Sequence, residues 1–241
     1  MGEHVSYANC GLPYFVSGVI DQREDLLLQT PGSLNARFRL NVKVRHRVLS
    51  IDAKAKTVSV QNLDTQEIFE DSYDNLVLAT GAKPRMPDVA GIERALSLRD
   101  VTDVDSLKDA LAKAPVQTVA IIGGGFVGIE LAENIRKLGF GVTVMQRDRQ
   151  ILGGFDLEMI EPLQQRLIDE GIALALGTAL VEITQDEIIL ASGERVSAGV
   201  VIAAAGVTPD NQLAEAAGLK IGETGGLWVD SQQRTSEPSI F

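Results

Sequence analysis

The stretch from Val119 to Arg147, VAIIGGGFVGIELAENIRKLGFGVTVMQR, constrains the fold more than any other part of the chain. Residues 119–122 are apolar and mostly β-branched, which is typical of a buried strand. Glycines follow at positions 123, 125 and 128, and apolar residues then recur every three or four positions, which predicts a helix that Gly139 ends. Residues 142–145 predict a second buried strand. This order of strand, glycine turn, helix and strand predicts a Rossmann-type unit.

The glycine turn has the spacing GxGxxG, in which each glycine has a separate role. The first lets the chain turn sharply, the second lets the backbone approach a pyrophosphate, and the third lets the helix pack on the strand. The pyrophosphate then accepts hydrogen bonds from free N–H groups at the helix N-terminus. A glycine-rich turn without a ligand is the alternative. We expect a dinucleotide to bind at Gly123, Gly124, Gly125, Phe126, Val127 and Gly128.

Charge and composition argue against several classes of partner. The chain has 241 residues and a net charge of −11, which argues against binding to nucleic acid or to an anionic membrane surface. No stretch is long and apolar enough to span a membrane, and the N-terminus lacks a signal-peptide pattern, so we expect a cytoplasmic protein. We expect no metal site. The single cysteine, Cys10, cannot form an internal disulfide.

The segment around Cys10 predicts a short helix. Apolar residues from Leu12 to Val19 have helical spacing, and Pro13 suits a first helical turn, where its missing N–H is not needed. Cys10 is therefore expected at a helix N-terminus, where N–H groups stabilise a thiolate. The role of a small buried hydrophobic side chain is the alternative for a free cysteine.

The other segments predict a mixed α/β chain. Alternating residues over 42–73 predict an antiparallel β meander, and residues 75–80 predict a buried strand followed by Gly81. Helices are expected at 104–112 and 157–170, although Pro162 favours a later start for the second. Further strands are expected at 172–176, 180–183, 187–190, 195–196 and 200–204, and a short helix or turn at 213–218.

Four segments resemble the flavin-dependent pyridine nucleotide-disulfide oxidoreductases, and they occur in that family's order. They are SYANCGLPY at 6–14, SYDNLVLATGAKPRMPDVAGI at 72–92, GGGFVGIELAE at 123–133 and AAGVTPD at 204–210. The first resembles the redox-cysteine segment of the branch that contains coenzyme A-disulfide reductase and persulfide reductase. That branch uses one active cysteine. The resemblance extends over nearly the whole chain.

The resemblance implies an α/β fold with a Rossmann-like pair of FAD- and NAD(P)-binding domains and an antiparallel β meander. Residues 1–112 are expected to be a partial FAD-binding domain with the redox cysteine, 113–235 the NAD(P)H-binding domain, and 236–241 the start of the return to the FAD-binding domain. The FAD half is expected to be incomplete, because family members have a flavin-binding strand with its own GxGxxG upstream, and a second flavin motif and a dimerisation domain downstream. We therefore expect a fragment of a longer homodimeric enzyme that binds FAD weakly by itself.

The resemblance also implies a mechanism. NAD(P)H bound at 119–206 is expected to reduce FAD, and the electrons are then expected to reach a disulfide or persulfide held by Cys10. Ser6 and Asn9 match positions near the thiol substrate, with local turn or capping chemistry as the alternative. Further expected cofactor contacts are Gly206 in the nucleotide site and Val48, Ala79, Thr80 and Gly81 in the flavin site.

Two residues of the predicted central helix match family positions near the nicotinamide. Phe126 matches the residue beside the nicotinamide path, with simple packing as the alternative. Glu130 matches a carboxylate near that path, with a solvated charge on the helix face as the alternative.

The end of the second central strand bears on the choice of nucleotide. An acidic residue there normally binds the ribose 2′-hydroxyl of NADH. This chain instead has Gln146, followed by Arg147, Asp148 and Arg149. A neutral glutamine does not repel a 2′-phosphate, and either arginine can bind one. We therefore expect NADPH rather than NADH, with a solvated loop, or Asp148 as a ribose ligand, as the alternatives.

Two other functions stay open on the sequence alone. An NADH oxidase or peroxidase would cycle Cys10 through a sulfenic acid. The LPY run after Gly11 resembles the thiol branch more than this peroxide branch. The 241-residue chain by itself can also be a non-catalytic nucleotide-binding module.

Overall fold

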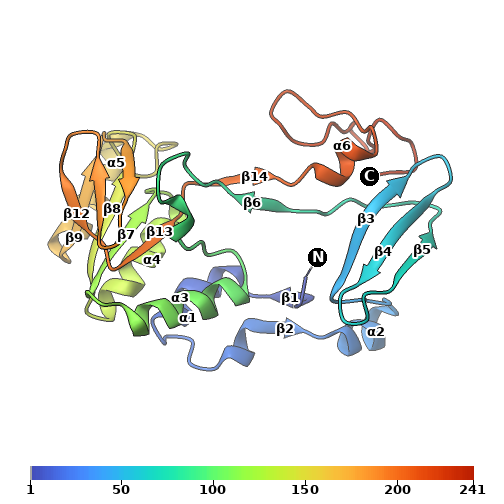
Figure 1. The fold of residues 1–241 in the computed structure, drawn as a ribbon, viewed down its shortest axis with the longest axis horizontal. Coiled ribbons are helices and arrows are strands. Elements are labelled where there is room, and N and C mark those ends of the chain that lie inside the picture. The colour runs from blue at the N-terminus through green and yellow to red at the C-terminus, as the bar shows by residue number, and fades with distance from the viewer. Residues whose placement is uncertain (1) are drawn as a thin grey trace. The chain divides into compact units, whose positions relative to one another are not determined.

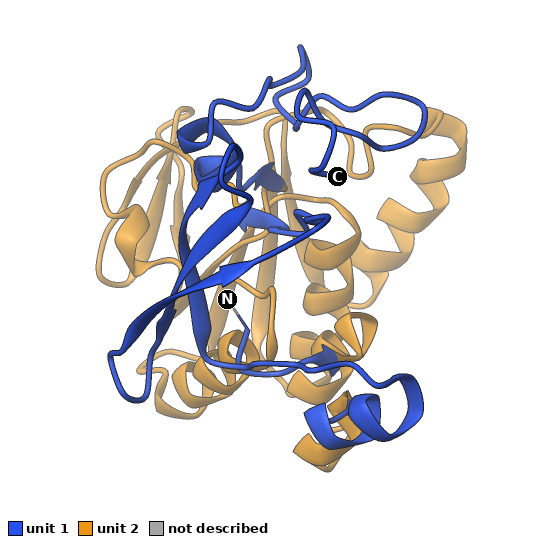
Figure 2. Ribbon diagram, turned by 90° about the vertical axis from the view of Figure 1, so that its right-hand side faces the viewer, with its two compact units in different colours: residues 1–6, 29–83, 207–241 blue, residues 7–28, 84–206 orange. Residues whose placement is uncertain are grey.

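The computed structural model describes residues 2–241, which divide into two compact units (Figure 2). Unit 1 comprises the chain up to Ser6 together with Gln29–Lys83 and Val207–Phe241, and unit 2 comprises Tyr7–Leu28 and Pro84–Gly206. These units are compact parts of the fold, and their bounds do not show which residues bind which cofactor. The expected FAD- and NAD(P)H-binding domains at 1–112, 113–235 and 236–241 therefore stay predictions.

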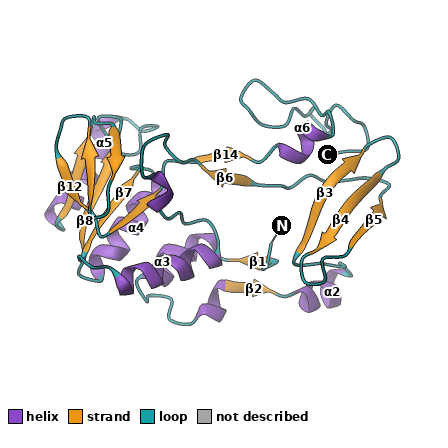
Figure 3. Cartoon of the chain, in the orientation of Figure 1, coloured by secondary structure: helices purple, strands orange, loops and turns teal. Residues whose placement is uncertain are grey.

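Unit 2 is built on a parallel sheet of four strands (Figures 1 and 3). The strands lie in the order β13 (Val200–Ala203), β7 (Thr118–Ile122), β8 (Gly141–Gln146) and β9 (Ile172–Leu176). Helix α4 (Phe126–Lys137) connects β7 to β8, and helix α5 (Leu157–Asp169) connects β8 to β9. The predicted strand, glycine turn, helix and strand are thus confirmed.

Both faces of this sheet are apolar because both are covered. On one face, Val119, Ile121 and Val144 pack with helices α1 (Leu12–Val16), α3 (Val101–Lys113), α4 and α5. On the other face, Ala120 and Ile122 pack with the antiparallel sheet of β10 (Leu180–Ile183), β11 (Glu187–Leu190) and β12 (Arg195–Ser197). Successive residues of β7 therefore enter different cores, which explains the continuous apolar run in the sequence.

Helix α3 begins at Val101, earlier than the expected start at residue 104, because Asp100 caps it. The Asp100 carboxylate accepts hydrogen bonds from the amides of Thr102 at 2.9 Å and Asp103 at 3.0 Å. Burial raises the pKa of this carboxyl, but the hydrogen bonds from Thr102 and Asp103 together outweigh burial and hold the pKa below its usual value.

Helix α1 is shorter than predicted. It has 5 residues and ends at Val16, not Val19, and a 3₁₀ turn over Asn9–Gly11 precedes it. Gly18, with φ of 79°, follows the helix in the left-handed region. Cys10 therefore lies in a 3₁₀ turn and not at the start of a multi-turn helix. The expected helix-dipole contribution to a thiolate is correspondingly small. The same segment contains β1 (Ser6–Tyr7), which pairs with β2 (Leu27–Gln29), and a 3₁₀ turn at Arg23–Leu26.

Unit 1 contains the predicted meander. Strands β3 (His46–Asp52), β4 (Thr57–Asn62) and β5 (Ile68–Ser72) pair antiparallel in that order. Helices α2 (Pro31–Phe38) and α6 (Gln212–Ala216) are short. Strands β6 (Ala82–Pro84) and β14 (Val207–Pro209) form a further two-stranded sheet, and each contains or adjoins a point where the chain passes from one unit to the other.

Residues 75–80 do not form the predicted buried strand. Their backbone pairs with a neighbouring segment at Leu76 and Leu78, whose amides donate to the carbonyls of Ser239 and Phe241. Val77, which lies between them, is 71% exposed. The apolar composition suggested a buried strand, but a short pairing with 239–241 leaves an extended segment with an isolated bridge.

The later start that Pro162 suggested for α5 was also wrong. The helix begins at Leu157, so Pro162 lies inside it. Proline there removes the hydrogen bond to the carbonyl of Glu158, which belongs to an exposed turn where water can replace the bond. The longest helices, α3 and α5, have 13 residues, and no helix within residues 2–241 is long and apolar enough to cross a membrane.

Candidate functional site

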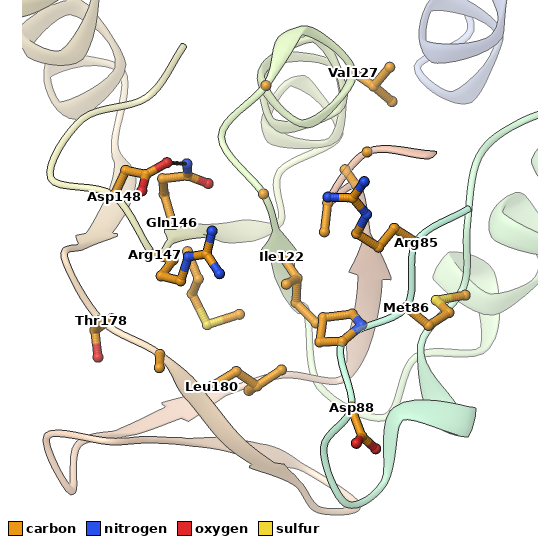
Figure 4. Close-up of a pocket in the computed structure, with 18 of the residues that line it drawn as sticks. Arg85, Met86, Asp88, Ile122, Val127, Gln146, Arg147, Asp148, Thr178 and Leu180 are labelled. Carbon is orange, nitrogen blue, oxygen red and sulfur yellow. Dashed lines mark hydrogen bonds between the residues drawn. The ribbon is translucent and has the colours of Figure 1, made fainter. Parts of the chain in front are cut away.

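A pocket of about 840 Å³ lies within unit 2 at the carboxyl ends of the parallel strands (Figure 4). Each strand contributes a segment that ends or follows it: Gly123 after β7, Gln146 in β8, Thr178 after β9 and Ala204 after β13. Strands β7 and β13 are neighbours, whereas the chain leaves β7 towards β8 on the other side. Such a change in strand order opens a crevice in which α/β proteins bind ligands.

Packing within the protein explains three of the four glycines in the turn. A β-carbon at Gly123 would collide with the carbonyl oxygen of Ala204, and one at Gly128 would collide with the carbonyl oxygen of Gly123. At Gly124 it would lie 2.8 Å from the Cγ2 atom of Ile151. These glycines let strand, helix and loop approach closely, so by themselves they do not require a ligand.

Gly125 is different, because nothing in the protein requires a glycine there. It is the N-cap of α4 in an extended conformation, with φ of −83° and ψ of −176°, which any residue can adopt. A β-carbon would meet no atom within 4 Å, and the residue lines the pocket. The absent side chain leaves the first amides of a 12-residue helix open to the pocket. This cradle fits the pyrophosphate of a dinucleotide.

The end of β8 supports the glycine turn and lines the pocket. Gln146 accepts a hydrogen bond from the Gly124 amide at 3.1 Å and donates one to the Asp148 carboxylate at 2.8 Å. Arg147 is exposed, lines the pocket and has no hydrogen bond or ion pair with another residue in the described part of the chain. Arg149, which the sequence placed beside it, does not line the pocket.

The opposite wall was not predicted. It consists of residues 85–88, with 178–180 completing the rim. The Arg85 amide donates to the Gly206 carbonyl at 2.9 Å, which holds this wall against the predicted contact residue Gly206. The side chains of Arg85 and Arg147 lie on opposite sides of Ile122 (Figure 4). The only signal in the sequence was the pair of prolines at 84 and 87, which marked a loop but not its destination.

The two expected nicotinamide neighbours differ in position. Phe126 lines the pocket and is 63% exposed, with an edge-to-face contact to Phe155 at a centroid separation of 6.1 Å. Val127 also lines the pocket. Glu130 is half-buried and does not line it. Simple packing therefore explains Phe126 poorly, because most of its ring faces outward.

Cys10 is exposed, and its thiol is free. Asn9 is exposed and Ser6 is half-buried, and neither side chain forms a hydrogen bond to any residue within 2–241. The 3₁₀ turn and α1 also have no side-chain caps. The capping alternative for Ser6 and Asn9 therefore has no support, and the buried alternative for Cys10 is wrong.

The residues predicted to contact flavin belong to unit 1 and are absent from the pocket. The Thr80 hydroxyl donates to the Asp210 carbonyl at 2.7 Å, and the Asp210 amide donates to the Gly81 carbonyl at 3.0 Å. These polar groups are satisfied inside their own unit. The assignment of Val48, Ala79, Thr80 and Gly81 to FAD stays a prediction. Among the described residues, no group of three or more His, Cys, Asp or Glu side chains is arranged to hold a metal ion.

A family model described as pyridine nucleotide-disulphide oxidoreductase matches residues 1–241. The chain belongs to this family. Its members include FAD-dependent enzymes that use NAD(P)H, and the α/β, Rossmann-type fold expected from the sequence is confirmed. The resemblance stated from four sequence segments is therefore also confirmed.

Relatives in this pyridine nucleotide-disulphide oxidoreductase family cover the chain almost completely. The coenzyme A disulfide reductase of Staphylococcus aureus (strain bovine RF122 / ET3-1) is 31% identical over 239 residues, which are 98% of this chain and 54% of that protein. The crystal structure of reduced Bacillus anthracis CoADR-RHD has a TM-score of 0.96 at 35% identity and covers 100% of this chain and 44% of that one. This chain spans about half the length of the curated relatives it matches.

Other similar solved structures are those of enzymes named for different reactions. An NAD-dependent persulfide reductase from A. fulgidus has a TM-score of 0.94 at 31% identity and covers 100% of this chain and 46% of that one. An engineered water-forming NADPH oxidase bound to NADPH has a TM-score of 0.89 at 26% identity and covers 98% of this chain and 53% of that one. The family therefore fixes the fold and the cofactor class but not the substrate.

Proposed function

We propose that this chain forms part of an NAD(P)H-dependent flavoprotein that reduces low-molecular-weight disulfides or persulfides, of the coenzyme A-disulfide type, through Cys10. The observation that carries the proposal is the exposed, free thiol of the only cysteine, within the same compact unit as the nucleotide pocket. Relatives with coenzyme A disulfide reductase and persulfide reductase activity support the choice of substrate class.

NAD(P)H is proposed to bind in the pocket of unit 2. Its pyrophosphate would lie at Gly125, where the first amides of α4 and the helix dipole favour an anion. The reactive end of the nucleotide is proposed to lie towards Phe126 and Val127. A bound FAD would supply the two-electron transfer between nicotinamide and sulfur, which no side chain of this chain provides.

Cys10 is proposed to act as the nucleophile. Its thiolate attacks one sulfur of the substrate RSSR, the S–S bond breaks, RS⁻ leaves and a mixed disulfide with Cys10 remains. Two electrons from NAD(P)H then cleave this mixed disulfide and restore the Cys10 thiolate. The sum is RSSR + NAD(P)H + H⁺ → 2 RSH + NAD(P)⁺, and a persulfide RSSH gives RSH and H₂S instead. Ser6 and Asn9 are proposed substrate contacts because their side chains have no hydrogen bond within residues 2–241.

The proposal is tested by the products of NAD(P)H oxidation by the FAD-loaded enzyme that contains this chain. With coenzyme A disulfide under anaerobic conditions, we expect two thiols for each NAD(P)H consumed, measured with a thiol-reactive dye. The water-forming oxidase among the relatives defines the competing outcome. NAD(P)H oxidation that requires oxygen or peroxide and yields no thiol would reject the reductase and favour the oxidase or peroxidase. Absence of oxidation with any acceptor would favour a nucleotide-binding module.

The choice of nucleotide is proposed to depend on Arg147. This arginine lines the pocket without a partner in the described chain, and its guanidinium can form charge-assisted hydrogen bonds to a 2′-phosphate. We expect Arg147→Ala to weaken NADPH binding about 10- to 50-fold and to leave NADH binding almost unchanged. Nucleotide fluorescence titration of the chain measures both affinities.

Arg149→Ala is the matched control for this prediction, because Arg149 carries the same charge but does not line the pocket. It should change NADPH affinity only slightly. Equal affinities for NADH and NADPH that Arg147→Ala leaves unchanged would contradict the preference and favour Asp148 as a ribose ligand. The homodimer and the cytoplasmic location inferred from the sequence stay predictions.

A further inference from the structure

Asn134 is a buried amide in helix α4. Its side chain is 0% exposed, and no other polar or charged side chain in the described residues of unit 2 is buried to this degree. Its Oδ1 atom accepts a hydrogen bond of 2.6 Å from the hydroxyl of Ser17, a residue 117 positions earlier. Its Nδ2 atom donates to the Glu130 carbonyl at 2.8 Å, one turn back in α4. Both ends of the amide are therefore bonded.

The bond to Ser17 joins helix α4 to the end of helix α1, and both helices are labelled in Figure 1. Ser17 is the C-cap of α1, which follows the 3₁₀ turn containing Cys10. Asn134 belongs to α4, which begins at Gly125 in the nucleotide pocket. The pair therefore connects the segment with the thiol to the helix that is proposed to hold the pyrophosphate.

Helix α3 also bonds to the Cys10 segment, which we define as the 3₁₀ turn, helix α1 and Ser17, residues 9–17. The Lys108 ammonium donates to the Phe15 carbonyl at 3.2 Å and lies 3.7 Å from the centroid of the Phe15 ring. Arg23, which follows the segment, pairs with Asp105 of α3, with an Nη2–Oδ2 distance of 2.8 Å. The Cys10 segment is thus bonded to both helices that cover it.

A packing role alone does not explain the Asn134–Ser17 pair. An apolar side chain of similar size would fill the same space in the core without the desolvation of an amide. The apolar contacts of Leu12, Phe15 and Val16 are non-directional and tolerate sliding of α1 along α4. The hydrogen bond does not, because a shift would leave the buried Oδ1 atom of Asn134 without a donor, while the Ser17 hydroxyl would keep only the Tyr14 carbonyl of its own helix, at 3.1 Å. A satisfied polar pair with one fully buried member can fix one register.

We infer that Asn134 and Ser17 are positioning residues that fix the Cys10 segment on the nucleotide-binding helix, so that thiol and pocket keep one relative geometry. The consequence for turnover rests on the proposed function, whereas the docking of the segment is measurable without it. Misplacement of a reacting group by about 1 Å can lower a rate by about 100-fold, so this register matters for a thiol that must meet its substrate and electron donor.

The test is the double variant Ser17→Ala/Asn134→Leu in the FAD-loaded enzyme that contains this chain. Removal of Ser17 alone would leave the buried Oδ1 atom of Asn134 without a donor, but removal of both polar groups can be nearly neutral for stability. We expect an unfolding midpoint close to that of the unchanged protein and amide hydrogen exchange over residues 15–20 at least about 10-fold faster. We also expect kcat for disulfide reduction to fall at least about 10-fold, with the KM for NAD(P)H and the reduction of an artificial dye unchanged. Ser17→Thr keeps the hydroxyl and should retain the original exchange and kcat.

The double variant, the Ser17→Thr variant and the unchanged enzyme together distinguish the positioning role from its alternatives. Unchanged exchange and kcat in the double variant would overturn the positioning role. An equal loss in Ser17→Thr would also overturn it, because the hydroxyl would then not be the active feature. Faster exchange in the double variant, together with no disulfide reduction by the unchanged enzyme, would support the docking role and reject the proposed function.

Discussion

Replacement of Cys10 by serine is expected to lower NAD(P)H-dependent reduction of disulfides and persulfides at least about 1,000-fold. A serine hydroxyl is not ionised near neutral pH and cannot form the mixed disulfide through which exchange proceeds. No second cysteine is present in the chain to replace it. Cys10 does not line the nucleotide pocket, so NAD(P)H affinity should stay within about twofold of the original.

The Cys10→Ser measurement requires the FAD-loaded enzyme that contains this chain, with thiol release, flavin reduction and NAD(P)H binding followed separately. Flavin reduction by NAD(P)H should persist, because it precedes the step that needs sulfur. Alkylation of the unchanged enzyme with iodoacetamide is the matched chemical control, since Cys10 is the only thiol of this chain and is exposed. Normal disulfide turnover by the serine variant would make Cys10 a structural residue and remove the thiol-branch assignment.

The parts of the fold that the sequence predicted are those governed by short-range patterns. The glycine turn with its flanking strand and helix was predictable because apolar period, turn and helix end agree over residues 119–147. The meander at β3–β5 was predictable from alternation. The buried strand predicted at 75–80 was wrong because an apolar run does not show whether a partner strand exists. Here, among the described residues, the backbone of this run pairs only with residues 239–241. The start of α3 was missed because its cap, Asp100, precedes the apolar pattern.

In the candidate site too, the residues close to the central motif in the sequence were predictable, and those that reach the site through long-range contacts were not. Gly125, Phe126 and Gln146 were predictable because they belong to or directly follow the central motif. The wall at 85–88 lies at the pocket because its chain pairs with a segment more than a hundred residues later, where the Arg85 amide donates to the Gly206 carbonyl, and no local pattern signals such a pairing. Asn134 was missed because one polar residue in a helix pattern resembles an exposed position, whereas the structure shows it buried and bonded to Ser17.

A second large effect is expected from replacement of Gly125 by aspartate. This change should weaken NAD(P)H binding at least about 100-fold without loss of stability. Aspartate is among the preferred N-cap residues, and the backbone and space at this position accept a side chain. Its carboxylate would stand where the pyrophosphate is proposed to lie, and repulsion between like charges in such a site costs several kcal/mol. Fluorescence titration of the chain with NADPH and a thermal unfolding scan measure the two effects.

Two matched variants separate charge, bulk and folding in this prediction. Gly125→Asn has nearly the same shape as Gly125→Asp and also caps helices well, so it should weaken binding less, by the difference that charge makes. Gly128→Ala adds only a methyl group but collides with the Gly123 carbonyl, so it should lower the unfolding midpoint. Tight NADPH binding by a stable Gly125→Asp protein would place the pyrophosphate elsewhere. The glycine turn would then be a packing device, as Gly123, Gly124 and Gly128 already are.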